Sequence, residues 1–254
     1  MNSNSRFSFL FLLLILFACQ SPVVGMAGST PPSHQLWNEL LKSNVKPNGQ
    51  VDYKGFIREK PKLEKYLKLL SENAPDRKTW SKNEQLAYWI NVYNAFTVKL
   101  IVDFYPTKSI RDLGPRIKIP LIKDVWHYKF FKIAGVEMSL DEVEHSILRK
   151  EFEEPRIHFA INCASVSCPP LLNEAFVAAN LENQLTRVTT TFINDPTRNK
   201  ISSQSAQLSS IFSWFKGDFT KKGTLIEFLN RYAKVKLSPN ARITFLDYNW
   251  NLNE

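Results

Sequence analysis

Apolar residues recur every three or four positions over several stretches of the chain, which is the spacing of one face of an α-helix. The longest stretch begins at the capping pattern Ser-Lys-Asn-Glu (81–84) and ends before Tyr105-Pro106, and it predicts the main core helix. On its apolar stripe or beside it lie Asn91 and Asn94, which must either bind neighbouring backbone or line a site. Shorter periodic stretches predict helices over 34–41, 56–72, 139–150, 180–194, 210–219 and 224–233.

Alternating or continuous apolar runs predict the strands. Hairpins are expected over 127–138, with its turn at Ala134-Gly135, and over 201–208, and a last strand over 243–246. Residues 156–162 are apolar on both faces and predict a central strand. Together these elements predict a single compact α+β domain, in which a small central mixed or antiparallel sheet is packed by several helices.

The segment after this predicted strand, CASVSCPP over 163–170, has the composition of a loop that hosts chemistry. A thiol-dependent hydrolase or transferase needs a thiolate, a base and a group that orients the base. Cys163 and Cys168 supply thiols, and Ser165 and Ser167 are polar neighbours that bind or turn the loop. Because no histidine follows Cys168, only an arrangement with the histidine before the cysteine remains.

Glu144 and His145 lie on or beside the apolar face of the predicted helix 139–150. A carboxylate that faces a core needs a cation or several donors, and Arg149 or Arg156 could supply one. Glu144 is therefore either a structural ion-pair partner or part of a catalytic Glu-His pair. The other histidine nearby, His158, has the opposite strand parity to Cys163, so His145 is the preferred partner. The expected catalytic set is Cys163, His145, Glu144 and Asn94, and the expected binding set is Asn91, His158, Ser165, Ser167, Cys168 and Arg149.

The N-terminus predicts export. Arg6 precedes an apolar run over 7–17, and the run is a secretory signal that is too short to span a bilayer. Leu-Phe-Ala-Cys over 16–19 resembles the lipobox of bacterial lipoproteins, which implies a signal peptide over 1–19 and a lipid on Cys19. By the same resemblance, Gln20 implies the periplasmic face of the outer membrane. Residues 20–32 then form a flexible tether and residues 33–254 the domain. Ordinary cleavage near residues 24–28, which would release a soluble exported protein, is the alternative.

Export also changes the expectation for the thiols, because two cysteines in an oxidising compartment are candidates for a disulfide. The second functional hypothesis is thus a non-enzymatic, lipid-anchored binding or structural domain with a Cys163–Cys168 disulfide and an unknown envelope partner or polymer. The formal charge is +9, but the lysines are scattered and no basic run alternates with aromatic residues, which argues against nucleic acid. No cofactor is expected, because no glycine-rich phosphate loop and no common zinc spacing are present.

Several blocks of the chain resemble one family, the domain of unknown function 547. The blocks are WINVYNA over 89–95, SLDEVEH over 139–145 with Leu148-Arg149, the loop 162–170, IFSWF over 211–215 with Asp218-Phe219, and DYNWNLN over 247–253. The resemblance implies a compact α+β domain and brings no settled activity. A distant similarity to papain-like thiol enzymes is a further expectation about the fold. The enzymatic and the binding hypotheses both remain open at this point.

Overall fold

The computed structural model of the chain describes residues 30–113 and 124–254. The predicted signal segment with Cys19, and the predicted tether up to residue 29, lie outside the described residues. None of the helices in the described part combines the length and the apolar content that a membrane span requires. The helices of the first half are α1 (Gln35–Asn44), α2 (Tyr53–Arg58), α3 (Lys60–Glu72) and α4 (Lys82–Phe104).

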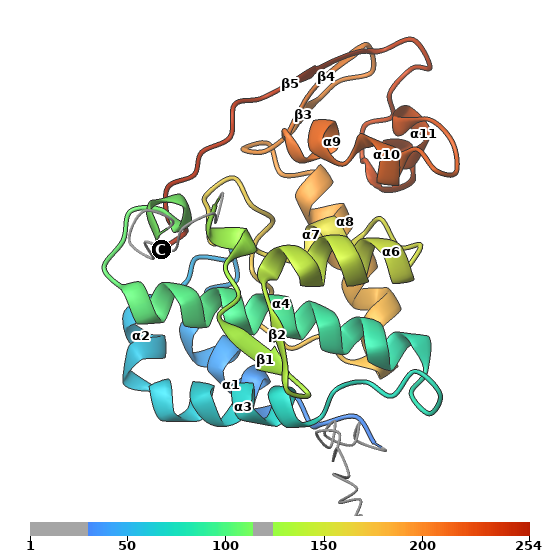
Figure 1. The fold of residues 1–254 in the computed structure, drawn as a ribbon. Helices are drawn as coiled ribbons and strands as arrows, with labels where there is room; N and C mark the ends of the chain where they lie inside the picture. Colours follow the sequence, from blue (N-terminus) through green and yellow to red (C-terminus); the bar gives the residue numbers. More distant parts are fainter. Residues whose placement is uncertain (1–29, 114–123) are drawn as a thin grey trace, which may run out of the picture.

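Helix α4 runs through the middle of the molecule, with α1, α2 and α3 beneath it in Figure 1. The predicted capping box is present: Glu84 N donates to Ser81 Oγ (3.2 Å), and Ser81 N donates to Glu84 Oε2 (2.7 Å). Sixteen of its residues are buried, on all sides of the helix, as expected for a core helix rather than a surface helix. The prediction of a main core helix is confirmed.

The predicted hairpin is also confirmed, as β1 (Phe131–Ile133) paired antiparallel with β2 (Val136–Met138). Its two turn residues, Ala134 and Gly135, have φ values of 49° and 81°, the left-handed pair that a tight two-residue hairpin turn requires. The ring of Phe131 stacks on Phe96 of α4 at a centroid distance of 3.9 Å. The hairpin is thereby packed against the core helix, which it crosses in Figure 1.

The predicted helix over 139–150 forms as a π-helix, η3 (Glu142–Leu148), continued by α6 (Arg149–Glu151). Its hydrogen bonds join residues five apart, as in the donation from Arg149 N to Glu144 O. A π-turn is wider than an α-turn and is frequent at functional sites. Here the widened segment carries Glu144 and His145.

The predicted central strand over 156–162 is wrong, because residues Ile157–Ala160 form the short helix α7. Phe159 N donates to Arg156 O (3.0 Å), and Ile161 N donates to Ile157 O (3.1 Å). A short run that is apolar on every side fits a buried helical turn as well as a central strand, and periodicity cannot separate the two. The strand parity that set His158 apart from Cys163 therefore does not apply.

The second half completes two small sheets packed by helices, and the predicted α+β class is confirmed. Strand β4 (Ser205–Leu208) lies between β3 (Lys200–Ile201), to which it is antiparallel, and β5 (Arg242–Phe245), to which it is parallel. The predicted hairpin over 201–208 and the predicted strand over 243–246 correspond to these strands. The remaining elements are η1 (Ile110–Asp112), η2 (Val125–His127), η4 (Ala178–Asn180), α8 (Leu181–Ile193), β3 (Lys200–Ile201), β4 (Ser205–Leu208), α9 (Ile211–Trp214), α10 (Lys216–Phe219), α11 (Leu225–Tyr232) and β5 (Arg242–Phe245).

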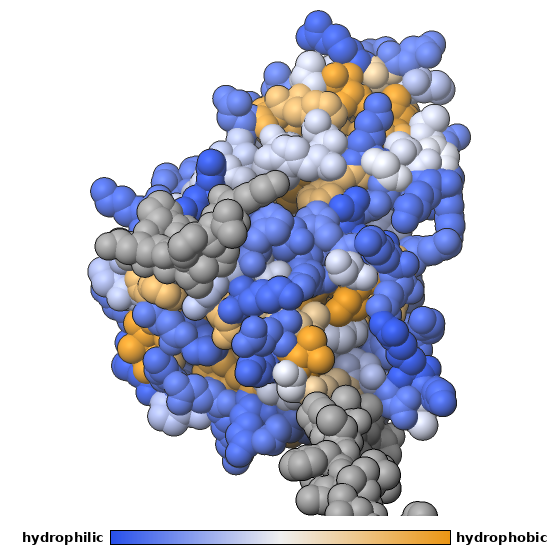
Figure 2. Space-filling view, in the orientation of Figure 1, coloured by the Kyte–Doolittle hydropathy of each residue, from blue (hydrophilic) through white to orange (hydrophobic). Residues whose placement is uncertain are grey.

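The helices of the second half share an aromatic core. Five buried phenylalanine rings form seven contacting pairs, with centroid distances of 4.9–6.3 Å. They are Phe159, Phe192, Phe212, Phe219 and Phe228. Aromatic side chains bury much apolar area each, so this cluster ties α7 to α8 and α9–α11. The outer face in Figure 2 is mostly hydrophilic, with small hydrophobic patches.

After β5 the chain descends along one side of the molecule and ends near the segment that follows α4 (Figure 1). Leu252 N donates to Lys108 O (2.8 Å), and Val166 N donates to Asn251 O (2.8 Å). Residues 246–254, the C-terminal segment, therefore lie against the loop that carries the cysteines. This return is what brings the last aromatic residues of the chain to that loop.

Candidate functional site

The loop that carries both cysteines is held by amide side chains. Asn94 of α4 donates to Ala160 O (2.9 Å) and accepts from Asn162 N (2.9 Å), which joins the core helix to the start of the loop. The Asn162 side chain accepts from Ala164 N (2.8 Å) and donates to Pro169 O (2.7 Å), which joins the two ends of the loop. Buried, fully satisfied hydrogen bonds of this kind hold a loop in one shape.

Asn91 acts in the same way one turn earlier on α4. Its side chain donates to Phe176 O (2.8 Å) and accepts from Phe176 N (3.1 Å). Both asparagines thus bind neighbouring backbone, the first of the two alternatives that the sequence left open. Neither lines either of the pockets that contain a cysteine, so Asn94 lies behind the loop rather than beside a thiol.

Cys163 and Cys168 are free thiols in this structure, without the disulfide of the alternative hypothesis. Their Sγ atoms lie 2.8 Å apart, and Cys163 N donates to Cys168 Sγ (2.8 Å). Burial raises the pKa of Cys168 well above its usual range, so this thiol keeps its proton. The hydrogen bond from Cys168 lowers the pKa of Cys163 to about 7 against the effect of burial. Ser165 Oγ (3.4 Å) and Tyr248 OH (3.3 Å) act in the same direction, so Cys163 is the thiol that ionises near neutral pH.

The backbone turns sharply just after Cys163. Ala164 is fully buried and has a φ of 58°, in the left-handed region that side chains other than glycine rarely adopt. Its amide is held by the Asn162 side chain, as described above. Backbone strain of this type persists only where the surrounding structure enforces it, and it is concentrated at functional sites.

Cys163 opens into a cavity of about 330 Å³, here called the aromatic pocket. Apolar walls with a few converging polar groups are the usual composition of a small-molecule site. Three of the four histidines of the chain line it. The lining residues are Tyr93, Asp124, Trp126, His127, Asp141, Glu144, His145, His158, Ile161, Cys163, Cys168, Pro169, Ile211, Trp214, Phe215, Tyr248 and Trp250.

Glu144 is the most perturbed carboxyl group of the pocket. It is 8% exposed, and its pKa is raised to about 8, first by burial and then by the charge of Cys163. A hydrogen bond with Tyr93 and the charge of Arg149 oppose this shift only in part. At neutral pH Glu144 is therefore a carboxylic acid that faces an ionisable thiol.

His158 also faces Glu144. Its ring stacks on Phe215 at a centroid distance of 3.9 Å, and its Nε2 lies 2.8 Å from Asp218 Oδ2. Its Nδ1 is buried without a hydrogen-bond partner in the described part of the chain and lies 3.9 Å from Glu144 Oε1. Burial lowers the pKa of His158, although Asp218 opposes the shift, so the ring is neutral at neutral pH. With Nε2–H directed at the carboxylate, Nδ1 presents a lone pair toward Glu144.

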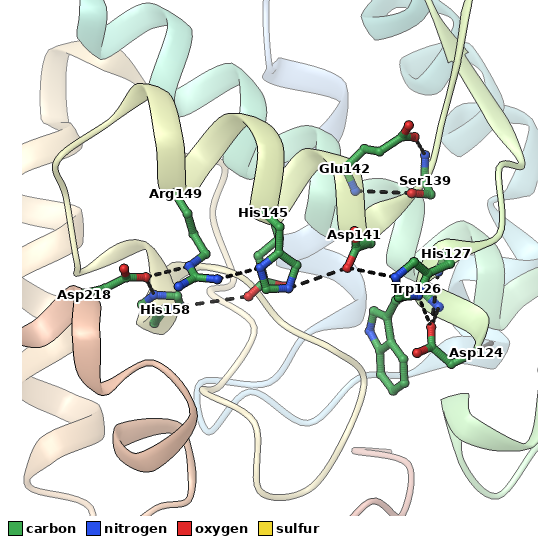
Figure 3. Close-up of polar contacts among 11 residues, drawn as sticks. Asp124, Trp126, His127, Ser139, Asp141, Glu142, His145, Arg149, His158 and Asp218 are labelled. Carbon is green, nitrogen blue, oxygen red and sulfur yellow. Dashed lines mark hydrogen bonds and ion pairs between the residues drawn. The ribbon is translucent and has the colours of Figure 1, made fainter. Parts of the chain in front are cut away.

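Arg149 extends this arrangement, as Figure 3 shows. Its Nε donates to Asp218 Oδ2 (2.6 Å), and its Nη1 lies 2.7 Å from His145 Nδ1. Because a guanidinium only donates, His145 accepts at Nδ1 and carries its proton on Nε2, 3.6 Å from Asp141 Oδ1. His127 Nε2 lies 3.5 Å from the same Asp141 oxygen. These contacts form one chain from Asp218 through Arg149 to Asp124, and its last four residues line the aromatic pocket: His145, Asp141, His127 and Asp124.

The two histidines differ in their contacts. Both ring nitrogens of His145, the expected partner of Cys163, face Arg149 and Asp141, and burial lowers its pKa. His158, expected only in the binding set, has the Asp218 carboxylate at Nε2 and presents the lone pair of Nδ1 toward Glu144. Within the described residues no hydrogen bond joins a histidine to Cys163, whereas Glu144 feels the charge of Cys163 and has His158 Nδ1 3.9 Å from its Oε1.

Sequence reasoning missed three contributors to the site, Tyr93, Asp218 and Tyr248. Asp218 and Tyr248 lie in blocks that carried only the family resemblance, and an acidic residue within the aromatic stretch 211–219 was the signal for Asp218. Ser165 contacts the thiol, whereas Ser167 Oγ accepts from Asn249 N (2.9 Å) and joins the loop to the C-terminal segment. Among the described residues, no group of three or more candidate side chains is placed to hold a metal ion.

Residues 77–193 match the family model described as "Protein of unknown function, DUF547". This stretch of the chain belongs to the DUF547 family. The resemblance inferred from the sequence blocks is confirmed, and the DUF547 match contains Glu144, His158 and Cys163. The blocks at 211–219 and 247–253, with Asp218 and Tyr248, lie beyond the matched stretch. No curated protein and no solved structure matches the chain, so the similarity to papain-like enzymes stays a prediction.

Proposed function

We propose that the chain is a thiol-dependent enzyme that transfers an acyl group to water or to another acceptor, with Cys163 as nucleophile and Glu144 as general acid and base. One observation carries the proposal: a single cavity holds a thiol with a pKa lowered to about 7 and a carboxyl group with a pKa raised to about 8. At neutral pH the pair is poised as thiolate and carboxylic acid, the forms from which acyl transfer starts. Oppositely perturbed titratable groups in one pocket favour an acid–base site.

The first step forms a bond between Cys163 Sγ and the carbonyl carbon of the substrate. The bond from that carbon to the leaving oxygen, nitrogen or sulfur breaks, and Glu144 gives its proton to the leaving atom. In the second step, water or another acceptor attacks the resulting thioester and gives its proton to the Glu144 carboxylate. The bond to Sγ then breaks, which restores both the thiolate and the carboxylic acid, so no further reactant is needed.

His158 and Asp218 position Glu144 in this mechanism. The lone pair at His158 Nδ1 lies 3.9 Å from Glu144 Oε1, so it acts on the carboxylic acid proton electrostatically rather than through a hydrogen bond. Asp218 fixes the tautomer that presents this lone pair. In this arrangement Cys163 is the nucleophile, Glu144 carries the proton, and His158 with Asp218 orients Glu144. In this proposal His158 replaces His145, which the sequence favoured.

The test uses the purified full-length chain, kept reduced, with p-nitrophenyl acetate as an activated ester. We expect release of nitrophenolate and, by intact-protein mass spectrometry, a transient acetyl group on Cys163. Cys163→Ser should remove both. The matched control is Ser167→Ala, since Ser167 lies on the same loop outside the aromatic pocket and its variant should keep both signals. An acetyl group that persists in Cys163→Ser, or no acetylation of the wild type, contradicts the proposal.

A second candidate function is a non-enzymatic binding domain in which Cys163 and Cys168 form a disulfide. The short Sγ–Sγ separation of 2.8 Å and the predicted export into an oxidising compartment favour it. So short a closed loop gains only about 2–3 kcal/mol, so the bond would mainly hold the loop in shape. Thiol titration of the denatured protein, isolated from its own compartment with and without reductant, separates the two candidates. Two thiols without reductant favour the enzyme, and none before reduction favours the binding domain.

We further propose that the protein is exported and anchored by a lipid on Cys19 at the periplasmic face of the outer membrane, near its envelope partner or polymer. Support comes from the signal-like segment and the lipobox-like residues 16–19. Metabolic labelling with an alkyne fatty acid should mark the wild type but not Cys19→Ser. An unlabelled, soluble wild-type protein cleaved near residues 24–28 would favour the soluble exported form instead.

A further inference from the structure

Four aromatic rings form one wall of the aromatic pocket. They come from three separate segments, namely η2, α9 and the C-terminal segment. Neighbouring ring centroids are close, at 5.5 Å for Trp126–Trp250, 4.5 Å for Tyr248–Trp250 and 4.7 Å for Trp214–Tyr248. Trp214 is 50% exposed, whereas Tyr248 OH lies 3.3 Å from Cys163 Sγ. The wall therefore extends from solvent to the thiol.

The charge of the pocket differs in sign from that of the whole chain, which is +9. The described residues that line the pocket include Asp124 and Asp141 but no lysine or arginine. The Oδ1 atom of each carboxylate faces His127, and within the described ranges each Oδ2 atom has no hydrogen-bond partner. The Cys163 thiolate adds a further negative charge to the described lining.

An aromatic wall next to unpaired carboxylate oxygens favours a cation. The ring face carries a negative quadrupole that attracts a cation, most strongly where water is excluded. Cations already lie over two rings of this region, since the guanidinium carbon of Arg111 is 5.3 Å from the Trp250 ring and that of Arg149 is 5.1 Å from the Phe215 ring. An anionic ligand would be repelled, and a neutral apolar ligand would leave the carboxylate oxygens desolvated without a partner.

We propose that the aromatic pocket selects acyl compounds that carry a compact ammonium group close to the acyl bond. The inference rests on the proposed function, because Cys163 as nucleophile sets where the carbonyl carbon lies. The ammonium group lies against the wall of Trp126, Trp214, Tyr248 and Trp250, with Asp124 and Asp141 as its counter-charges. The acyl carbon then lies at Cys163 Sγ, on the Tyr248 side of the wall.

The test compares two thioesters of the same shape with the full-length chain. Acetylthiocholine carries a quaternary ammonium group, and S-(3,3-dimethylbutyl) thioacetate has a neutral carbon in its place. We expect kcat/KM to be about tenfold higher for the cation, since cation–π attraction at a desolvated site is of that size. Added salt should reduce the preference, because screening weakens the attraction to the carboxylates.

Two variants test which residues cause the preference for the cationic thioester. Asp124→Asn keeps the oxygen that caps η2 but removes the charge, and Trp214→Leu removes an exposed ring, so neither should unfold the chain. Each should lower the preference for acetylthiocholine several-fold, measured as the ratio of kcat/KM for the two thioesters in the same variant. The matched control is Phe245→Leu, an exposed ring outside the pocket, which should keep the full preference.

A binding measurement keeps this inference separate from the proposed function. In Cys163→Ala, which cannot react, tetramethylammonium chloride should quench tryptophan fluorescence saturably, and sodium chloride at equal ionic strength should not. Quenching without hydrolysis of any ester would overturn the proposed function but support a cation site. Equal hydrolysis of both thioesters, with no specific quenching, would overturn the inference and leave the proposed function standing.

Discussion

Two hollows share the cysteine loop as a wall, and Cys168 lines both. The aromatic pocket measures about 330 Å³. The second hollow, here called the polar pocket, measures about 590 Å³ and is lined by residues of the loop 162–173 together with Gly49, Arg187, Asp195, Arg198 and Glu254, among others. On size alone the polar pocket would be the site.

Three of the four charged residues in the described lining of the polar pocket form ion pairs, either with one another or with a neighbouring residue. Arg187 pairs with Glu174 and Arg198 pairs with Asp195. Burial would raise the pKa of Asp195, but its hydrogen bonds and the charge of Arg198 outweigh burial and lower it. In the aromatic pocket the opposite holds for Glu144, whose pKa burial raises to about 8 because no cation compensates it fully.

The polar pocket instead serves the loop that it shares. Arg198 Nε donates to Cys168 O (3.0 Å), and its Nη2 donates to Val166 O (3.0 Å). These bonds hold the loop from one side while Asn162 holds it from within. The two pockets therefore differ in role. The paired charges of the polar pocket hold the cysteine loop in shape, whereas the buried Glu144, which pairs with no cation among the described residues, indicates that the aromatic pocket is the candidate catalytic site.

The largest effect is expected for Glu144→Gln. It should lower kcat for p-nitrophenyl acetate by about 10²–10⁴-fold, the usual contribution of a general acid and base. In the wild type the rate should rise with pH as Cys163 ionises near its pKa of about 7 and fall as Glu144 loses its proton near its pKa of about 8. The variant should lack the alkaline fall.

Glu142→Gln is the matched control, because Glu142 lies two residues away on the same π-helix and outside the aromatic pocket. It accepts from Ser139 N (2.9 Å) at the start of the helix, a bond that glutamine can keep. Its pH–rate profile should match that of the wild type. A similar loss of kcat in both variants would contradict the assignment of Glu144 as the general acid and base.

The second effect concerns the pH dependence of stability. The pKa of Glu144 is raised from 4.5 to about 8, so folding favours its protonated form. The free energy of unfolding should therefore fall as pH rises from about 4.5 through 8, by up to roughly 5 kcal/mol from this group. Urea unfolding of the wild type and Glu144→Gln across that interval measures it. Parallel curves would contradict the raised pKa.

The third effect is on the thiol itself. Cys168→Ala removes the largest cause of the lowered pKa of Cys163. The pKa should rise, and iodoacetamide alkylation of Cys163 at pH 7 should slow by about fivefold or more, because only the thiolate reacts. Cys168→Ser, whose hydroxyl can donate the same hydrogen bond, should restore part of the rate. Equal rates in all three proteins would show that Cys168 does not support the thiolate.

The smallest effect is expected in the polar pocket, for Arg187→Ala. This arginine is half exposed and pairs with Glu174 near solvent. Exposed ion pairs of this kind contribute at most about 1 kcal/mol. Chemical denaturation should show a change within that range, and the acetylation rate of Cys163 should stay at the wild-type value. A large loss of activity would mean that the polar pocket takes part in the reaction.

Several features followed from the sequence because they depend on neighbours along the chain. The capping box at Ser81 and Glu84, the hairpin turn at Ala134-Gly135 and the apolar faces of the helices are local patterns, and the structure contains them. The burial of Glu144 could also be inferred, since its position on an apolar helical face depends only on spacing. The family resemblance rested likewise on short blocks of sequence.

Only the tertiary structure decided which groups meet. Whether 157–160 is a helix or a strand depended on what surrounds a short apolar run, and that choice brought His158 to the pocket of Cys163. Asp218 reached His158 from sixty residues away in sequence. The pKa of Glu144 arises from burial and from the charge of Cys163, and the pKa of Cys163 arises from hydrogen bonds that act against burial. No spacing along the chain contains these effects. Periodicity determines which face of an element is buried, whereas chemistry depends on the pairwise distances that packing sets.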